Sequence, residues 1–135
     1  MTVMALKIDL KPHEKVIISG AVVRNGPKRS EFIIENSAPV LREKDIMRPD
    51  DATTYCSKIY LAVQMMYIDG GNLAEYHRTY WTLVRDLVNA VPSTVEHVGR
   101  ISEHLLKNEY YQALKDAKKL IDYEQEVLNR VRSAT

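Results

Sequence analysis

The sequence predicts an α+β protein, in which a small antiparallel β-sheet is followed by a bundle of about four helices. Through the first 49 residues apolar and polar side chains alternate, which is the period of a half-buried strand. Beyond Pro49 the apolar residues recur at helical spacing, and this change of period is the main boundary in the chain. We therefore expect a β part over residues 1–49 and a helical part over residues 50–135.

Turn residues divide the β part into strands. Residues 6–10 alternate between apolar and charged side chains, so we expect a strand with one buried face and one mostly basic face. Residues 16–23 are rich in β-branched side chains, and Gly20 within them indicates a bulge or bend in one long strand. The Asn-Gly pair at 25–26 favours a tight hairpin turn, from which the chain returns over residues 30–35.

Residues 38–47 lead from the first part to the second and carry a concentrated charge cluster. The four charged residues 42–45 stand between the apolar pairs 40–41 and 46–47. This arrangement predicts a short edge segment whose apolar ends are buried while its middle remains in water. A solvated connector is the simpler interpretation of these charges, and a binding site is the alternative.

Capping and helix-breaking residues place the helix boundaries. Asn72 and Ser93 each stand three residues before a glutamate, which is the spacing of a capping box, and Asn108 can cap the last helix. The glycine pair at 70–71 and Pro92 end the helices that precede them. The expected helices cover about residues 54–68, 72–91, 93–107 and 109–132.

The sequence offers no positive support for catalysis or for a metal site. His97 and His104 are seven residues apart, which on one helix separates them by roughly 10 Å, too far to share an ion. Neither Cys56 nor any serine stands in a recognisable nucleophile motif, and the glycine pair at 70–71 lacks the lysine of a phosphate-binding loop. We expect a protein that is not an enzyme and that needs no cofactor.

Three features predict a cytoplasmic protein that does not enter the membrane. Cys56 is the only cysteine, so no intrachain disulfide can form and a reducing compartment is the natural one. The almost wholly apolar run over residues 59–68 is far shorter than the roughly 20 residues that cross a bilayer. The N-terminus lacks the long apolar segment of a signal peptide.

Binding is better supported than catalysis, and the residues suggest two surfaces. Residues 1–30 contain six cationic side chains against two acidic ones, and strands and hairpins can lay such cations against the phosphates and unstacked bases of RNA. Most aromatic residues lie in the helical part, where tyrosines commonly pack between helices. The sharper alternative is a partner-binding groove formed by Tyr76, Tyr80 and Trp81.

Five stretches carry a family likeness. They are residues 6–15 (LKIDLKPHEK), 20–26 (GAVVRNG), 40–47 (VLREKDIM), 64–67 (QMMY) and 109–124 (EYYQALKDAKKLIDYE). Taken in order over nearly the whole chain, they resemble the FlbT family of flagellar regulators. His13 departs from the family, which usually has glycine after the proline. Met4 is a second possible start, because the family's first strand begins within a few residues of its methionine.

The resemblance implies post-transcriptional control of flagellin. Members of the family are described as acting on the 5′ untranslated region of flagellin mRNA, where they repress translation and promote decay. They act in concert with the small flagellar protein FlaF. Some relatives behave as activators, so the sign of regulation stays open.

The β part has a fainter likeness to the carbon storage regulator family of RNA-binding dimers. There too a strand, a glutamate-containing turn, a long hairpin and a Val-x-Arg-Glu segment follow one another, and the first strand and the last segment grip RNA. By this likeness Arg42 is the first candidate RNA contact and Lys11 the second. Exposure and charge add Lys7, Lys15 and Lys44.

Two hypotheses about function follow. In the first, the β part binds the flagellin mRNA leader while the helices dimerise or recruit FlaF. In the second, the chain is a protein-binding adaptor whose aromatic-rich helices hold FlaF or flagellin, and its effect on mRNA is indirect. An exposed strand edge near Leu41 would favour a homodimer in either case.

Overall fold

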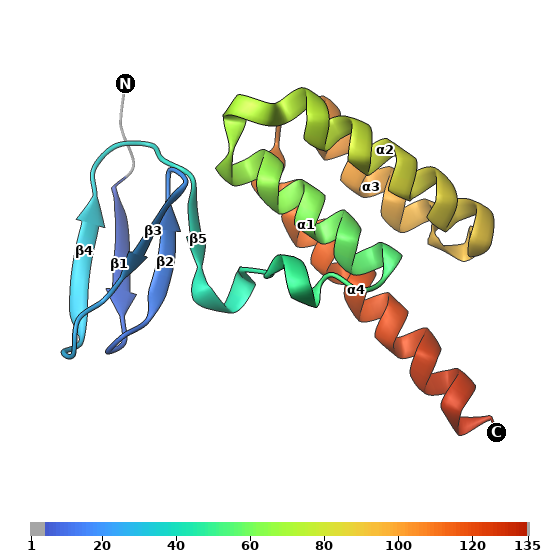
Figure 1. Cartoon of the computed structure of the whole chain (residues 1–135), viewed down its shortest axis with the longest axis horizontal. Helices are drawn as coiled ribbons and strands as arrows, with labels where there is room; N and C mark the ends of the chain where they lie inside the picture. The colour runs from blue at the N-terminus through green and yellow to red at the C-terminus, as the bar shows by residue number, and fades with distance from the viewer. Residues whose placement is uncertain (1–4, 135) are drawn as a thin grey trace. The chain divides into compact units, whose positions relative to one another are not determined.

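The computed structural model describes residues 5–134, and the chain divides into two compact units, residues 1–46 and residues 47–135. Strands build the first unit and α-helices the second (Figure 1). This order confirms the predicted α+β class. Met4, the second possible start, lies outside the described residues.

The first unit contains two small antiparallel sheets where one was expected. One sheet pairs β1 with β4, and the other has the order β3-β2-β5. Because alternate side chains of a strand point to opposite faces, Ile8 and Leu10 lie on the inner face of the first sheet, where they pack with Val16 of the second in a common core. The strands are β1 (Leu6–Leu10), β2 (Lys15–Ile18), β3 (Ala21–Arg24), β4 (Ser30–Ile34) and β5 (Val40–Arg42).

The tight hairpin of this unit lies at Ser19-Gly20 and joins β2 to β3. Both residues have positive φ angles, 50° and 84°, as a two-residue hairpin loop requires, and Ile18 pairs with Ala21 across the turn. The prediction of one long bent strand over residues 16–23 is therefore wrong, since Gly20 reverses the chain. Ser19 concealed the turn because serine seldom adopts a positive φ.

Asn25 and Gly26 do not form the predicted hairpin, because β4 pairs with β1 and not with β3. Asn25 is instead buried where the chain crosses from one sheet to the other. Its side-chain amide donates to the carbonyl oxygens of Leu10, Lys11 and Lys28, at 3.2, 2.8 and 2.9 Å. One side chain therefore holds the loop after β1 and the loop before β4 together.

His13 completes this loop region in a left-handed conformation. Its φ is 62°, and its backbone N–H donates to the carbonyl oxygen of Gly26 at 2.9 Å. Glycine adopts such a conformation without steric cost, and histidine tolerates it better than most residues do. The positive φ of His13 is therefore an accessible conformation for this residue.

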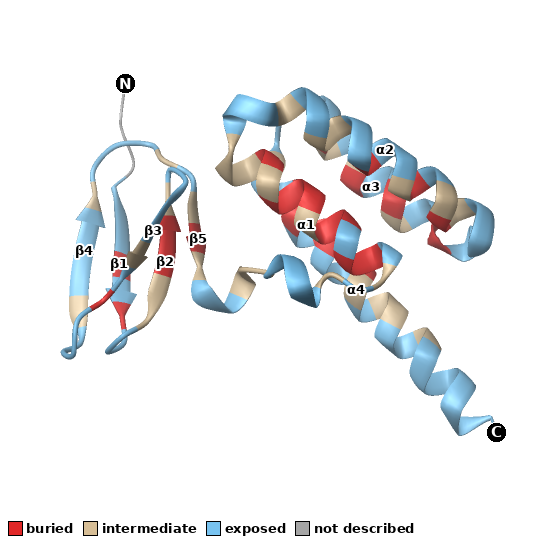
Figure 2. Cartoon of the chain, in the orientation of Figure 1, coloured by how far each residue is buried: buried red, intermediate tan, exposed pale blue. Residues whose placement is uncertain are grey.

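Four helices form the second unit: α1 (Tyr55–Ile68), α2 (Leu73–Ala90), α3 (Val95–Leu106) and α4 (Tyr110–Ser133). α1 packs against both α2 and α4, and α3 packs against α4. Buried residues are densest on α1 (Figure 2). Within residues 5–134, none of the helices combines the length and the apolar character that crossing a membrane requires.

Local capping explains one helix start and leaves the other three to packing. At the start of α1 the N–H of Ser57 donates to Thr54 Oγ1 at 3.1 Å, and the N–H of Thr54 donates to Ser57 Oγ at 2.8 Å. The predicted capping box at Asn72 is not formed, because its side chain donates to the carboxylate of Asp69. Nor does Ser93 cap α3, which begins without a side-chain cap. The predicted cap at Asn108 is also not formed, because α4 begins without a side-chain cap and Asn108 Oδ1 accepts from the Tyr110 hydroxyl.

Candidate functional site

Arg42, the first candidate RNA contact, ends β5 and bridges the two sheets of the first unit. It lies opposite Val16 of β2, at the edge of the β3-β2-β5 sheet. Its guanidinium Nη2 donates to the carbonyl oxygen of Asp9 at 2.5 Å and lies 3.8 Å from a carboxylate oxygen of Glu14. Because the side chain is 40% exposed, Arg42 braces the sheets while part of its guanidinium remains in water.

The outward face of the β1–β4 sheet is balanced in charge, so the expectation of a mostly basic face is wrong. Lys7 Nζ lies 3.3 Å from a carboxylate oxygen of Glu31 on the neighbouring strand. Asp9 accepts two hydrogen bonds from the Arg29 guanidinium, both at 3.0 Å, and these bonds lower the pKa of Asp9. Strand pairing thus supplies acidic neighbours that the β1 sequence alone does not reveal.

Within the first unit, the cations without an anionic partner are found mainly around the two loops that Asn25 joins. The carbonyl oxygens of Lys11 and Lys28 bind the same Asn25 amide, and Lys15 pairs with Arg24 in the adjoining β2–β3 ladder. Within residues 5–134 none of these four cationic side chains forms an ion pair. We call Lys11, Lys15, Arg24 and Lys28 the basic loop cluster.

Lys15 and Arg24 stand directly opposite each other in the antiparallel pair of β2 and β3. Like charges at directly opposed positions destabilise a strand pair. A phosphate near both would relieve this repulsion. Sequence reasoning did not include Arg24 and Lys28 among the site residues, although the concentration of cations around residues 24–29 was a usable signal.

The structure therefore places the predicted RNA contacts in three settings. Arg42 and Lys7 already have acidic neighbours. Lys11 and Lys15 belong to the basic loop cluster. Lys44 is exposed in a different element, the short 3₁₀ turn that follows β5.

The predicted partner groove on α2 does not exist as a set of three surface aromatics, because Tyr80 is fully buried. Its hydroxyl lies 2.8 Å from that of Ser102, and burial raises its pKa to about 12. Trp81 is 43% exposed and packs edge-on against the Tyr80 ring, with centroids 5.0 Å apart. Tyr76 donates its hydroxyl to the carboxylate of Asp69. Trp81 is thus the exposed aromatic of this set.

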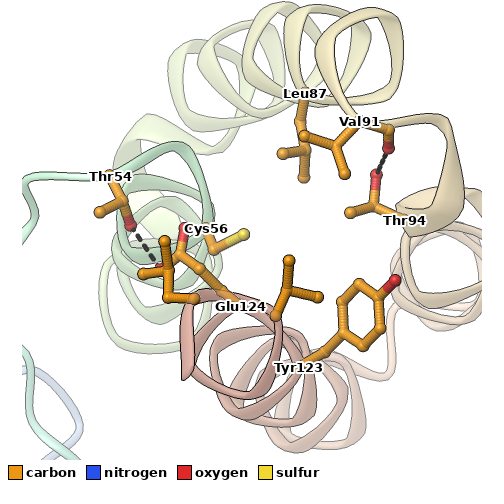
Figure 3. Close-up of a pocket in the computed structure, with 9 residues that line it drawn as sticks. Thr54, Cys56, Leu87, Val91, Thr94, Tyr123 and Glu124 are labelled. Atoms are coloured by element: carbon orange, nitrogen blue, oxygen red, sulfur yellow. Dashed lines mark hydrogen bonds between the residues drawn. The ribbon is translucent and has the colours of Figure 1, made fainter. Parts of the chain in front are cut away.

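A cavity of about 250 Å³ lies within the helical unit, between α1, the C-terminal end of α2 and α4 (Figure 3). Its wall is almost wholly apolar, with Leu87 and Val91 on one side and Val127 and Leu128 on the other. No motif in the sequence indicates this cavity, because its wall joins segments that are far apart along the chain.

The polar part of the cavity wall is satisfied internally. Thr54 Oγ1 donates to Glu124 Oε1 at 3.0 Å, so the carboxylate of Glu124 has a hydrogen-bond partner in the cavity wall. Burial, and secondarily Glu124, raises the pKa of the Cys56 thiol to about 12, so the thiol stays protonated at neutral pH and is a poor nucleophile. Among the described residues, no three His, Cys, Asp or Glu side chains are grouped to hold a metal ion. The cavity is therefore suited to binding apolar groups.

Comparison with known proteins identifies a family. The family model described as "Flagellar protein FlbT" matches residues 6–128. A relative named probable flagellum biosynthesis repressor protein FlbT 1, from Bradyrhizobium diazoefficiens, is 45% identical over 125 residues, which are 92% of this chain and 85% of the relative. The flagellum biosynthesis repressor protein FlbT of Caulobacter vibrioides is 42% identical over 132 residues, which are 96% of this chain and 94% of the relative. No solved structure matches the chain significantly.

Proposed function

The chain belongs to the FlbT family of flagellar proteins, and from this membership we propose that it regulates flagellin expression after transcription. In this proposal it binds the 5′ untranslated region of flagellin mRNA, represses translation and promotes decay of the message during flagellum biogenesis. The relatives named as flagellum biosynthesis repressors support the repressing sign.

The observation that carries the proposed RNA contact is the basic loop cluster. Its four cations have no ion-pair partner among the described residues, and two of them oppose each other across β2 and β3. Phosphates of a single-stranded leader would neutralise this charge. In this proposal the exposed part of the Arg42 guanidinium also contacts the RNA that the basic loop cluster binds.

A salt series tests this proposal. Purified protein is titrated against a labelled flagellin 5′ leader, with a scrambled RNA as competitor, between about 50 and 200 mM salt. Binding to the leader should weaken steeply as salt rises. In the variant Lys15→Ala/Arg24→Ala, affinity should fall at least about tenfold, and the slope of log K against log salt should become shallower by about 1.4.

The matched control removes the same charge from the helical unit. Arg48 and Lys58 are exposed and form no ion pair among the described residues, so Arg48→Ala/Lys58→Ala should leave both affinity and slope unchanged. If the two double variants bind RNA alike, or if the wild type binds the leader no better than the scrambled RNA, direct contact through this cluster is rejected.

The second candidate function is a protein-binding adaptor that acts through FlaF or flagellin. The 43% exposure of Trp81 favours it, because tryptophan is a frequent anchor of protein interfaces. In a pull-down with a FlaF-type protein, Trp81→Ala should reduce capture while the fold is retained. Undiminished capture by Trp81→Ala would exclude this residue as the anchor.

A further inference from the structure

His13 stands between Lys11 and Lys15 in the loop that follows β1, and both neighbours belong to the basic loop cluster. The side-chain amide of Asn25 holds this loop against the one that contains Lys28, a third member of the cluster. Chain connectivity and hydrogen bonds therefore place His13 among the cations of the cluster.

The backbone at His13 is held in a tight turn. The N–H of Glu14 donates to the carbonyl oxygen of Lys11 at 3.1 Å, and the N–H of His13 donates to that of Gly26 at 2.9 Å. Pro12 precedes the φ of 62° at His13, and proline followed by a residue of positive φ is the pattern of a type II turn. The side chain thus extends from a fixed backbone, which lowers the entropic cost of binding a ligand.

The imidazole of His13 is exposed. Among the described residues, its side chain takes part in no hydrogen bond, ion pair or ring contact. The sequence of residues 1–46 contains one other aromatic ring, Phe32, which is paired opposite the buried Ile8 and so lies on the inner face of the β1–β4 sheet. His13 is therefore the ring that accompanies the basic loop cluster at the surface.

Glu14, the acidic residue of this loop, is turned away from solvent. Its side chain is only 16% exposed, and one carboxylate oxygen accepts from the N–H of Lys11 at 2.9 Å. The other carboxylate oxygen lies 3.8 Å from the Arg42 guanidinium. The loop thus offers cationic groups and a flat ring, and single-stranded RNA has the complementary groups, phosphates and unstacked bases.

We propose that His13 stacks on an unstacked base of single-stranded RNA while the basic loop cluster binds the adjoining phosphates. This role of His13 rests on the proposed function, because it requires RNA at the cluster. Every base has a face on which a ring can stack, so the contact adds affinity. It adds no salt dependence, because that dependence comes from counterions released by neutralised phosphates.

Replacing His13 by glycine tests the stacking contact in the full chain. Glycine adopts the positive φ without steric cost, so His13→Gly removes the ring and keeps the turn. In the salt series with the flagellin 5′ leader, affinity should fall at least about fivefold. The slope of log K against log salt should stay unchanged, whereas loss of one cation from a phosphate would make it shallower by about 0.7.

Two further variants control for the backbone change and for charge. Ser19 is exposed and also has a positive φ, but it lies in the hairpin loop at the opposite end of the β2–β3 pair from Lys15. Ser19→Gly makes the same backbone change there and should leave RNA affinity unchanged. His13→Tyr keeps a ring that carries no positive charge, so it should retain most of the wild-type affinity. Circular dichroism verifies that each variant is folded.

Leader RNAs with a single abasic nucleotide identify the base that stacks. Each of them removes one base and keeps every phosphate. At one position the abasic change should weaken binding to the wild type and have no further effect on binding to His13→Gly. Such non-additivity is the evidence that a double-mutant cycle gives for a direct contact.

The possible results separate this contact from the proposed function. If the wild type binds the leader no better than the scrambled RNA, both are rejected. If the wild type binds the leader and His13→Gly binds it as tightly, the stacking role alone is overturned. A shallower salt slope in His13→Gly, an equal loss in Ser19→Gly, or the absence of any abasic position coupled to His13 would overturn it too.

Discussion

The guanidinium of Arg42 donates to the backbone carbonyl oxygen of Asp9 at 2.5 Å, and this bond links β5 of one sheet to β1 of the other. The same guanidinium lies near the largely covered carboxylate of Glu14. A residue expected to contact RNA therefore also stabilises the unit that would present it.

Replacing Arg42 should weaken the fold as well as any RNA contact. Arg42→Ala removes a charge-assisted hydrogen bond from a partly exposed side chain, so we expect the free energy of unfolding to fall by about 1 kcal/mol. Urea denaturation followed by circular dichroism measures the loss. Lys44→Ala, at an exposed position, should change stability by less than about 0.5 kcal/mol. Equal stability of the two variants would contradict the bracing role of Arg42.

Reversing one charge of the basic loop cluster should separate binding from stability. Arg24→Glu places a carboxylate opposite Lys15, so the free energy of unfolding should rise by roughly 0.2–1 kcal/mol while RNA affinity falls. Thermal unfolding and leader binding are measured on the same sample. A variant that loses stability, or that binds RNA as tightly as the wild type, would contradict this reading of the β2–β3 pair.

Asn25 should be the most sensitive polar residue of the first unit. It is 6% exposed, and its amide donates to three carbonyl groups, which Asn25→Ala would leave without that donor. We expect a loss of about 2–3 kcal/mol. Hydrogen exchange of β1 and β4 reports on this unit separately from the helices. Asn25→Asp keeps the size but not the donors, so it should show a similar loss. If β1 and β4 stay fully protected from hydrogen exchange in either variant, this stabilising role of Asn25 is contradicted.

High pH should destabilise the helical unit through Cys56 and Tyr80. Burial raises the pKa of both groups to about 12 in the folded chain, from ordinary values of 9.0 and 10.0. Their contribution to stability is therefore complete below the ordinary values and is lost as pH rises toward 12. The melting temperature of the helices should fall over this range. Cys56→Ala should make the fall smaller, and a melting temperature that is independent of pH up to 12 would refute the argument.

The buried thiol of Cys56 should also be unreactive in the native state. Because the thiol is covered and protonated at pH 8, a thiol-specific chromogenic reagent should label Cys56 slowly in buffer and rapidly in urea. Equal rates in the two conditions would show that the cavity wall is open at this position.

Sequence periodicity was sufficient for the class of the fold and for most of its elements. The alternation over residues 6–10 placed Ile8 and Leu10 on one face of a strand, and both are buried in the core that the two sheets share. Pro92 correctly separated α2 from α3. These features depend on conformational preferences within a few neighbouring residues, which a single sequence contains.

Strand pairing, by contrast, was decided by contacts between distant segments. Gly20 reads equally well as a bulge or as half of a hairpin loop, and only the pairing of β2 with β3 selects the loop. β4 lies beside β1 because the Asn25 side chain and the shared core bring residues 10 and 28 together. No local pattern specifies that register.

The candidate functional surfaces also have some properties that the sequence determined and others that only the fold decided. The sequence by itself determined which residues carry positive charge and which are aromatic, and hence which chemistry the surfaces can offer. Tertiary structure alone decided that Lys7 faces Glu31, that Lys15 and Arg24 oppose each other, and that Tyr80 is buried. The physical reason is that charge and shape belong to individual residues, whereas neutralisation, burial and cavities arise only when the chain folds and brings separate segments into contact.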